Sequence, residues 1–211
     1  MTKIGIIDYG CGNIQSVVNA FSALGAKPDL VRDPDDVDHY DQLVLPGVGA
    51  FQQAMDKLES RYFVEALNHK RAAGTPILGI CLGMQLLCSD SDETQSNQNN
   101  NFCAGLGWID AQVRHFAKLG VDSLKIPHMG WNEIRYAPDA PLFQGLSEQP
   151  DVYFVHSHAV IASDDSSVLA STRYGIEFAS AIHKDNVIGL QFHPEKSHKV
   201  GLKILENFLR L

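Results

Sequence analysis

Short apolar runs alternate with helical patterns through the first third of the chain. Three β-rich runs predict buried strands, at residues 3–8, 42–45 and 76–80. Apolar residues recur at helical spacing in three stretches between them, at residues 14–24, 50–59 and 61–73. This alternation of strand and helix is typical of parallel βαβ units, whose helices cover both faces of a sheet.

The boundaries of these elements are marked by residues with special backbone preferences. Asn13 is placed to cap the first helix, and Gly25 is placed to end it. Pro46 and Gly47 are predicted to end the second strand. The third strand runs directly into Cys81 and a further helix.

The second half of the chain predicts strands joined by turns, with little helix before its end. The strands are expected at residues 108–115, 131–136, 152–158, 177–183 and 187–192. An amphipathic helix is expected at 198–210, and the polar segment 89–101 predicts a solvated loop. We therefore expect one α/β domain over 1–211, with a mixed, mostly parallel sheet and an antiparallel portion in its second half.

Composition narrows the class of protein. A hydrophobic fraction of 45% and a charged fraction of 20% are ordinary for a globular protein, and the net charge of -8 argues against a nucleic-acid partner. No apolar stretch is long enough for a signal peptide or a membrane span. The four cysteines lack metal-ligand spacing. We expect reduced thiols, a cytoplasmic location and neither metal nor cofactor.

The pattern Gly-Ile-Cys-Leu-Gly at residues 79–83 matches a nucleophile elbow, with Cys81 in the place of serine. The strand before it and the helix after it are the context this motif requires. The helix N-terminus favours a thiolate, and the amide of Leu82 is placed to donate to an oxyanion. The alternative is that Cys81 is a small buried side chain, like Cys88 on the same predicted helix.

A thiol nucleophile requires a base, and His193 is the best of nine histidines. Pro194 favours an extended backbone at His193, so Glu195 projects to the same side and can orient the imidazole. A solvated pair at a strand end is the alternative when this segment is taken alone. His156 and His158 have no acid close behind them, so we assign them to pocket lining or packing.

The segment Pro-Gly-Val-Gly at residues 46–49 ends a strand just before a helix. Its backbone amides could bind an oxyanion, with Gly47, Val48 and Gly49 as the candidates, because glycine allows a peptide to turn. A simple tight turn is the alternative. A dinucleotide site is disfavoured because the third glycine of its motif is missing.

Together these motifs resemble the class I, triad-type glutamine amidotransferases, and within them the glutaminase subunits of imidazole glycerol phosphate synthase. The resemblance spans nearly the whole chain. It is carried by Asp-Tyr-Gly-Cys-Gly-Asn at 8–13, Leu-Pro-Gly-Val-Gly-Ala-Phe at 45–51, Gly-Ile-Cys-Leu-Gly-Met-Gln-Leu-Leu at 79–87, Pro-His-Met-Gly-Trp-Asn at 127–132, Tyr-Phe-Val-His-Ser at 153–157 and Gln-Phe-His-Pro-Glu-Lys-Ser at 191–197.

The resemblance implies a flavodoxin-like sheet, a γ-glutamyl thioester on Cys81 and an oxyanion strand that rearranges. It implies glutamine contacts by four residues, namely Gln85, Glu93, Ser157 and His158. At His158 the family usually has tyrosine. Asn13 and Trp131 would face a (β/α)8-barrel cyclase in a heterodimer, which would receive the ammonia internally for histidine biosynthesis. Every segment from 4 to 209 is needed for one fold, so the acceptor reaction is expected on that separate protein.

Three other functions remain open at this point. A paralogous subunit could supply ammonia for amidation of surface-polysaccharide sugars, and the stretch Lys-Ser-His-Lys at 196–199 is compatible with that branch. A cysteine peptidase could use the same elbow, although the 46–49 segment and Gln85 argue against it. A binding module with a relic site is disfavoured because Cys81, His193 and Glu195 are all present.

Overall fold

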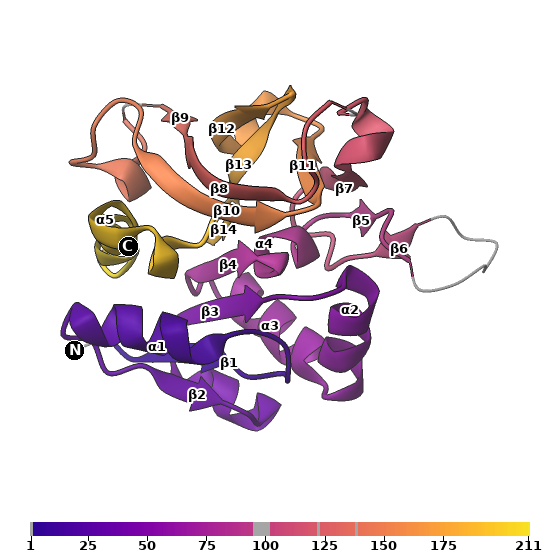
Figure 1. Cartoon of the computed structure of the whole chain (residues 1–211). Helices are drawn as coiled ribbons and strands as arrows, with labels where there is room; N and C mark the ends of the chain where they lie inside the picture. Colours follow the sequence, from indigo (N-terminus) through magenta and orange to yellow (C-terminus); the bar gives the residue numbers. More distant parts are fainter. Residues whose placement is uncertain (1, 95–101, 122, 138) are drawn as a thin grey trace.

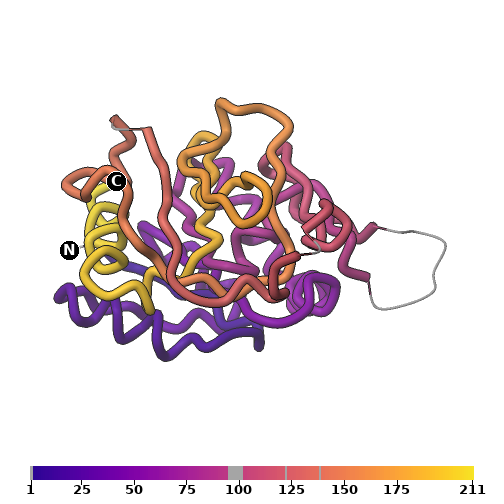
Figure 2. Tube along the Cα trace, turned by 45° about the horizontal axis from the view of Figure 1, so that its top comes forward, coloured from indigo at the N-terminus to yellow at the C-terminus, as the bar shows by residue number. Residues whose placement is uncertain are grey.

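The computed structural model describes residues 2–94, 102–121, 123–137 and 139–211 (Figure 1). Twelve of the described strands form one sheet, and two more form a separate strand pair. Among these residues, no helix combines the length and apolar character needed to cross a membrane. In Figures 1 and 2 the two ends of the chain lie on the same side of the molecule, near α1 and α5.

The first half of the sheet is parallel and has the order β2-β1-β3-β4-β14. Its strands are β1 (Ile4–Ile7), β2 (Asp29–Val31), β3 (Gln42–Gly47), β4 (Ile77–Cys81) and β14 (Val187–Leu190). Because parallel strands end at the same edge of a sheet, the segments that follow β3, β4 and β14 meet at one place. Residues from three distant parts of the sequence are thereby brought together.

Helices cover both faces of this sheet. They are α1 (Ile14–Ala23), α2 (Phe51–Ser60), α3 (Phe63–Ala72), α4 (Leu82–Leu86) and α5 (His198–Phe208). One buried cluster joins α1 and α5 to the sheet, for example through Phe21 and Phe208. The other cluster joins α2, α3 and α4 to the opposite face, for example through Phe51, Leu67 and Met84. The expectation of helices on both faces is confirmed.

The second half of the sheet is largely antiparallel, as the sequence predicted. β13 (Ile176–Lys184) pairs with β14 and connects it to the remaining strands. These are β5 (Asp90–Ser91), β6 (Cys103–Ala104), β7 (Ala111–His115), β9 (Arg135–Tyr136), β11 (His158–Ala162) and β12 (Val168–Tyr174). Short 3-10 helices complete the chain: η1 (Pro34–His39), η2 (Phe116–Leu119), η3 (Pro141–Phe143), η4 (Asp165–Ser167) and η5 (Pro194–Lys196).

The separate pair consists of β8 (His128–Glu133) and β10 (Asp151–His156), which run antiparallel. Figure 1 shows it beside β14 and α5. The amide of His193 donates to the carbonyl of Tyr153 at 2.9 Å, which ties β10 to the segment that follows β14. This pair therefore forms one wall beside the edge where the parallel strands end.

Several predicted boundaries in the first half were wrong. β3 does not end at Leu45 but continues through Pro46 to Gly47, which pairs with Cys81. Proline removes only one donor there, and its fixed φ suits an extended chain near a strand end. Asn13 occupies the N-cap position of α1, but its side chain makes no cap hydrogen bond. Helix α4 ends at Leu86, so Cys88 is not on it.

The strand predictions for the second half were right in place but wrong in extent. The stretch predicted at 108–115 is a strand only over 111–115, and the one predicted at 187–192 ends at Leu190. The stretch predicted at 131–136 is divided between β8 and β9, which belong to different sheets. The stretch predicted at 152–158 is likewise divided at Ser157 into β10 and β11. β2, β6 and β12 were not predicted at all, and β11 overlaps a prediction only at His158. Apolar alternation is local, so it does not show at which residue a chain passes from one sheet to another.

The predicted solvated loop 89–101 was partly wrong. Asp90 and Ser91 form β5 within the main sheet, and Ser91 and Asp92 are buried. Asp92 has partners for its charge: its carboxylate accepts from the amide of His115 and lies 3.2 Å from Nζ of Lys118. A polar sequence can therefore be buried when each polar group is paired. Residues 95–101 lie outside the described residues.

Candidate active site

Cys81 occupies a strained turn between β4 and α4. Its φ of 55° and ψ of -110° are unusual for a side-chain-bearing residue. A Cβ atom on Gly83 would lie 1.8 Å from the carbonyl oxygen of Leu45, and one on Gly79 would lie 2.7 Å from the carbonyl oxygen of Gly83. Glycine is therefore required on both sides of Cys81, because the turn brings the backbone of α4 directly against β3 and β4.

His193 and Glu195 lie together just beyond the end of β14. Nδ1 of His193 is 2.7 Å from Oε1 of Glu195, and both side chains are 3% exposed. Burial disfavours the charged imidazole, but hydrogen bonding and charge from Cys81 and Glu195 outweigh it and raise the pKa of His193 to about 10. Nε2, the ring nitrogen not held by Glu195, has no aligned hydrogen-bond partner among the described residues. It is therefore the nitrogen available to the sulfur.

The backbone around this pair is held by Ser197. Its hydroxyl donates to the carbonyl of His193 at 2.7 Å and accepts from the amide of Tyr153 at 3.0 Å. Ser197 is buried, so both bonds are shielded from water. The position of His193 is thus set by β10 as well as by its own strand.

The predicted oxyanion segment lies next to the nucleophile. Gly47 is the register partner of Cys81, so residues 48 and 49 follow directly beside the sulfur-bearing turn. Val48 is half-exposed, and Gly49 has a φ of +111°, a conformation that favours glycine. One small cleft is lined by this segment and by the predicted base and acid, through Asn13, Val17, Pro46, Gly47, Val48, Ile80, His193, Glu195 and Lys196.

Gln85 and Gln191, which was not among the predicted site residues, form a chain to the sulfur. Nε2 of Gln85 donates to Oε1 of Gln191 at 3.0 Å, and Nε2 of Gln191 lies 3.9 Å from Sγ of Cys81. Both glutamines are buried. Gln191 directly follows β14 and stands two residues before His193, and this position next to the predicted base is the sequence signal that could have found it.

The other predicted glutamine contacts gather between the N-terminus of α2 and β11. Oε2 of Glu93 accepts from the amide of Phe51, the first residue of α2, at 2.9 Å. The pKa of the His158 imidazole is lowered by burial, while the nearby carboxylates of Glu93 and Asp92 oppose this shift. Ser157 lies at the junction of β10 and β11. Glu93 and His158 are therefore within electrostatic reach of each other.

Comparison with known proteins identifies the family to which this chain belongs. The model of the family "Glutamine amidotransferase class-I" matches residues 5–211. The protein "Imidazole glycerol phosphate synthase subunit HisH" of Sulfurimonas denitrificans is 46% identical over 208 residues, which cover 98% of this chain and 97% of that protein. The protein of the same name from Syntrophotalea carbinolica is 47% identical over 208 residues, covering 97% and 98%. The chain belongs to the class I glutamine amidotransferase family.

Solved structures agree with this amidotransferase fold. One titled "Crystal structure of glutamine amidotransferase" has a TM-score of 0.73 at 17% identity and covers 98% of this chain and 97% of its own. The structure of PurLQS from Thermotoga maritima has a TM-score of 0.76 at 18% identity, covering 100% and 99%. At such low identity the likeness concerns the fold alone, and it confirms the predicted α/β class.

The predicted partner-facing residues of the amidotransferase lie near the cleft. Asn13 lines the cleft itself. Trp131 is 48% exposed, and its ring stacks on that of His198 with centroids 5.0 Å apart. Met129, on the same strand, is 62% exposed. An exposed tryptophan and methionine on one strand are typical of a surface that another protein covers.

His156, one of the two histidines weighed against His193 as the base, is buried in the protein interior together with His128. Nε2 of His158, the other one, lies 3.5 Å from Oδ1 of Asp92. Nδ1 of His128 lies 3.0 Å from Nε2 of His156, whose own Nδ1 donates to the carbonyl of His158 at 2.7 Å. Burial lowers the pKa of His128 to about 4 and that of His156 to about 3. Both rings are therefore neutral near pH 7, and their nitrogens are used within the fold rather than at the sulfur.

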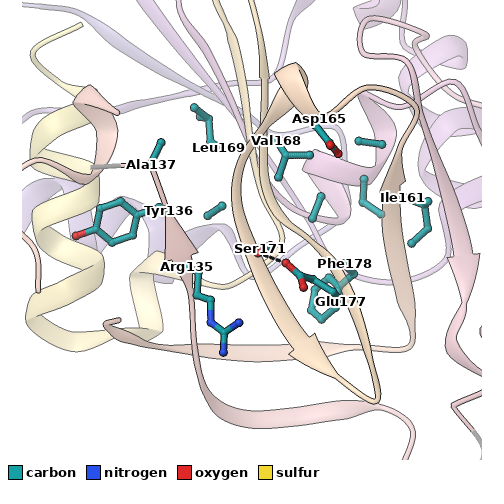
Figure 3. Close-up of a pocket in the computed structure, with 14 residues that line it drawn as sticks. Arg135, Tyr136, Ala137, Ile161, Asp165, Val168, Leu169, Ser171, Glu177 and Phe178 are labelled. Carbon is teal, nitrogen blue, oxygen red and sulfur yellow. Dashed lines mark hydrogen bonds between the residues drawn. The ribbon is translucent and has the colours of Figure 1, made fainter. Parts of the chain in front are cut away.

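A cavity of about 590 Å³ lies elsewhere, over β9, β11, β12 and β13 (Figure 3). Its lining contains none of the predicted site residues. Ser171 and Glu177, which Figure 3 shows facing each other, are joined by a hydrogen bond of 2.7 Å. The predicted base and acid, His193 and Glu195, line the small cleft instead.

Proposed function

We propose that this chain is the glutaminase subunit of an imidazole glycerol phosphate synthase. It hydrolyses L-glutamine to glutamate and ammonia through a thioester on Cys81, as one catalytic domain over 1–211. The observation that carries the proposal is the buried His193–Glu195 pair, whose imidazole gains its raised pKa in part from the Cys81 sulfur. Relatives that match nearly the whole chain bear the name of this synthase subunit.

The raised pKa of His193 favours an imidazolium beside a thiolate. The thiolate attacks the side-chain carboxamide of glutamine, forming the carbon–sulfur bond and a tetrahedral oxyanion. The imidazolium then gives its proton to the departing nitrogen, which leaves as ammonia and produces the thioester. Glu195 stays ionised and keeps the imidazole oriented.

The second half of the reaction uses the same residues in reverse roles. Neutral His193 takes a proton from water, and the resulting hydroxide attacks the thioester carbonyl. The carbon–sulfur bond breaks, glutamate leaves, and the thiolate is restored beside the imidazolium. Backbone amides of the segment 47–49 and of Leu82 are the proposed donors to both oxyanions, and losing one such donor typically costs about 3 kcal/mol.

A partner is part of this proposal. Ammonia released into water becomes ammonium, which is not a nucleophile, so it has to pass directly to the acceptor enzyme. We propose a heterodimer with a (β/α)8-barrel cyclase that makes imidazole glycerol phosphate and aminoimidazole carboxamide ribotide. The exposed side chains of Met129 and Trp131, near the cleft, support a covered surface there. We also propose a cytoplasmic location, because the four free thiols accord with a reducing compartment.

The test is Cys81→Ala in complex with the cyclase. Synthesis driven by glutamine is expected to vanish, whereas synthesis driven by added ammonium salt is expected to persist. Cys88→Ala is the matched control, because Cys88 is also buried but its thiol only donates to the carbonyl of Met84 at 3.7 Å. Glutamine-driven synthesis that survives in Cys81→Ala contradicts the proposed nucleophile.

The pathway is tested separately by the partner. The subunit alone is expected to hydrolyse glutamine slowly, and the cyclase is expected to accelerate it. Purification of the chain from its native host should recover the cyclase in equal amount. Recovery of a sugar-amidating enzyme instead would assign the same chemistry to the polysaccharide branch.

A further inference from the structure

The hydroxyl of Tyr9 is buried without a partner near the proposed oxyanion segment. Tyr9 follows β1, its side chain has no exposed surface, and its oxygen makes no hydrogen bond among the described residues. Buried tyrosines usually pair this group, because leaving it unpaired costs free energy. Burial, with smaller effects from Cys11 and Cys81, raises its pKa far above the usual value, so it remains a hydroxyl. It is therefore an unused donor and acceptor.

The position of this hydroxyl is defined by Gly47. A Cβ atom on Gly47 would lie 2.7 Å from the Tyr9 oxygen, 3.0 Å from Cβ of Leu82 and 3.1 Å from the amide nitrogen of Gly83. The hydroxyl thus occupies the corner where the end of β3 meets the first turn of α4. Only glycine fits at position 47, and that glycine is the register partner of Cys81.

The segment that begins at Gly47 has room to change its conformation. Val48 stands between two glycines, and its apolar side chain is 42% exposed instead of packed. Gly49 has a φ of +111° and meets no atom within 4 Å of its virtual Cβ. Glycines on both sides lower the steric barrier to rotation of the intervening peptide planes. Because a peptide is planar, rotation that turns its N–H to one side turns its C=O to the other.

We propose that Tyr9 is a positioning residue for the segment Gly47-Val48-Gly49. Its hydroxyl pairs with a peptide group of this segment when the segment turns an amide toward the oxyanion above Cys81. This inference rests on the proposed function. The hydroxyl is unpaired in the resting conformation and paired in the reactive one, so the interaction lowers the free energy of the transition state more than that of bound glutamine.

Tyr9→Phe in the complex with the cyclase tests this inference. The variant removes an unpaired group, so its thermal stability is expected to stay equal or rise. Its kcat for glutamine hydrolysis is expected to fall by roughly three- to tenfold, the net value of one hydrogen bond. KM for glutamine and synthesis from ammonium salt are expected to remain unchanged, because neither depends on the oxyanion.

Tyr136→Phe is the matched control. Its hydroxyl donates to the carbonyl of Ser147 at 2.7 Å, and Figure 3 shows the ring at the cavity, whose lining does not include Cys81. Removing this satisfied bond should lower thermal stability and leave kcat unchanged. The two variants are therefore expected to show opposite patterns, which a purely structural role for Tyr9 does not produce.

Two outcomes overturn the inference. One is an unchanged kcat in Tyr9→Phe, and the other is a kcat that falls together with stability and ammonium-driven synthesis. The proposed function is judged separately, by glutamine hydrolysis in the parent complex and its loss in Cys81→Ala. If those two results hold and Tyr9→Phe fails, only the role of Tyr9 is withdrawn.

Discussion

Nδ1 of His193 is held 2.7 Å from Oε1 of Glu195, and only 3% of either side chain is exposed. The remaining oxygen of Glu195 has no partner among the described residues, so the carboxylate is committed to the imidazole. A buried charge without a counter-ion is costly, and the imidazolium supplies one. This pair is the electrostatic centre of the proposed mechanism.

Glu195→Gln tests the importance of that charge. The amide cannot stabilise the imidazolium and can hold the wrong tautomer, so the pKa of His193 should fall. We expect kcat for glutamine to drop by about 10²- to 10⁴-fold, measured in steady state with the cyclase present. Glu206→Gln is the control, because Glu206 on α5 pairs only with Lys203 and with Arg210 beyond the helix, among the contacts that the described residues show. This variant should leave kcat unchanged. A fully active Glu195→Gln protein would contradict the orienting role.

The elbow glycine Gly83 gives a steric prediction. Its virtual Cβ lies 1.8 Å from the backbone oxygen of Leu45, and neither atom belongs to a flexible side chain. Gly83→Ala is expected to lose about 1–3 kcal/mol of unfolding free energy and most glutaminase activity. Gly25→Ala is the control: its φ is +81° but nothing lies within 4 Å, so only left-handed strain of about 1–2 kcal/mol is expected, with kcat retained. Urea unfolding measures the stability of both variants, and a glutaminase assay measures their activity. A Gly83→Ala protein with unchanged stability and activity would refute the tight turn.

The buried histidines predict a loss of stability in acid. Burial lowers the pKa of His128 to about 4 and of His156 to about 3, below the 6.5 of an unfolded chain. As pH falls below 6.5, the unfolded chain therefore binds more protons than the folded protein does. Each neutral histidine contributes its full stability above pH 6.5, and this contribution is lost progressively as pH falls from 6.5 to the pKa of that histidine in the folded protein. The slope is about 1.4 kcal/mol per pH unit for each histidine.

His193 acts in the opposite direction, because its pKa is raised to about 10. Its protonation stabilises the folded protein at low pH, and this stabilisation is lost as pH rises toward 10. Unfolding free energies from pH 7 to pH 5 measure the acid slope. The slope should become shallower in His156→Asn and stay the same in His69→Asn, whose side chain is 73% exposed. Equal slopes in the parent protein, in His156→Asn and in His69→Asn would mean that His156 is not buried in its neutral form.

Trp131 provides a prediction for the partner surface. Its exposed ring stacks on His198 and lies 6.0 Å from Tyr153, so it is held ready for contact without further ordering. Trp131→Ala is expected to weaken binding of the cyclase at least about tenfold, as truncation of an interface tryptophan often does. Tyr62→Ala is the control, since Tyr62 is 71% exposed at the α2–α3 turn. Calorimetry compares the two, and equal affinities would place the interface elsewhere.

Local sequence determined the elements that carry the chemistry. The pattern at residues 79–83 contains the glycines that the turn at Cys81 requires. The pairing of His193 with Glu195 was also predicted correctly, although Pro194–Lys196 form a 3-10 helix and not the extended chain that the prediction assumed. Three of the five parallel strands, β1, β3 and β4, followed from alternating strands and helices. In each case the signal lies within a few residues, where backbone preferences decide the outcome.

Tertiary structure decided what depends on distant residues. It extended β3 past Pro46, divided the 152–158 stretch between two sheets, and buried Asp92 with partners more than twenty residues away. It also placed Gln191 between Gln85 and the sulfur and left the hydroxyl of Tyr9 unpaired against Gly47. Pairing across a sheet and satisfaction of buried polar groups arise only when separate segments meet, so no local pattern encodes them.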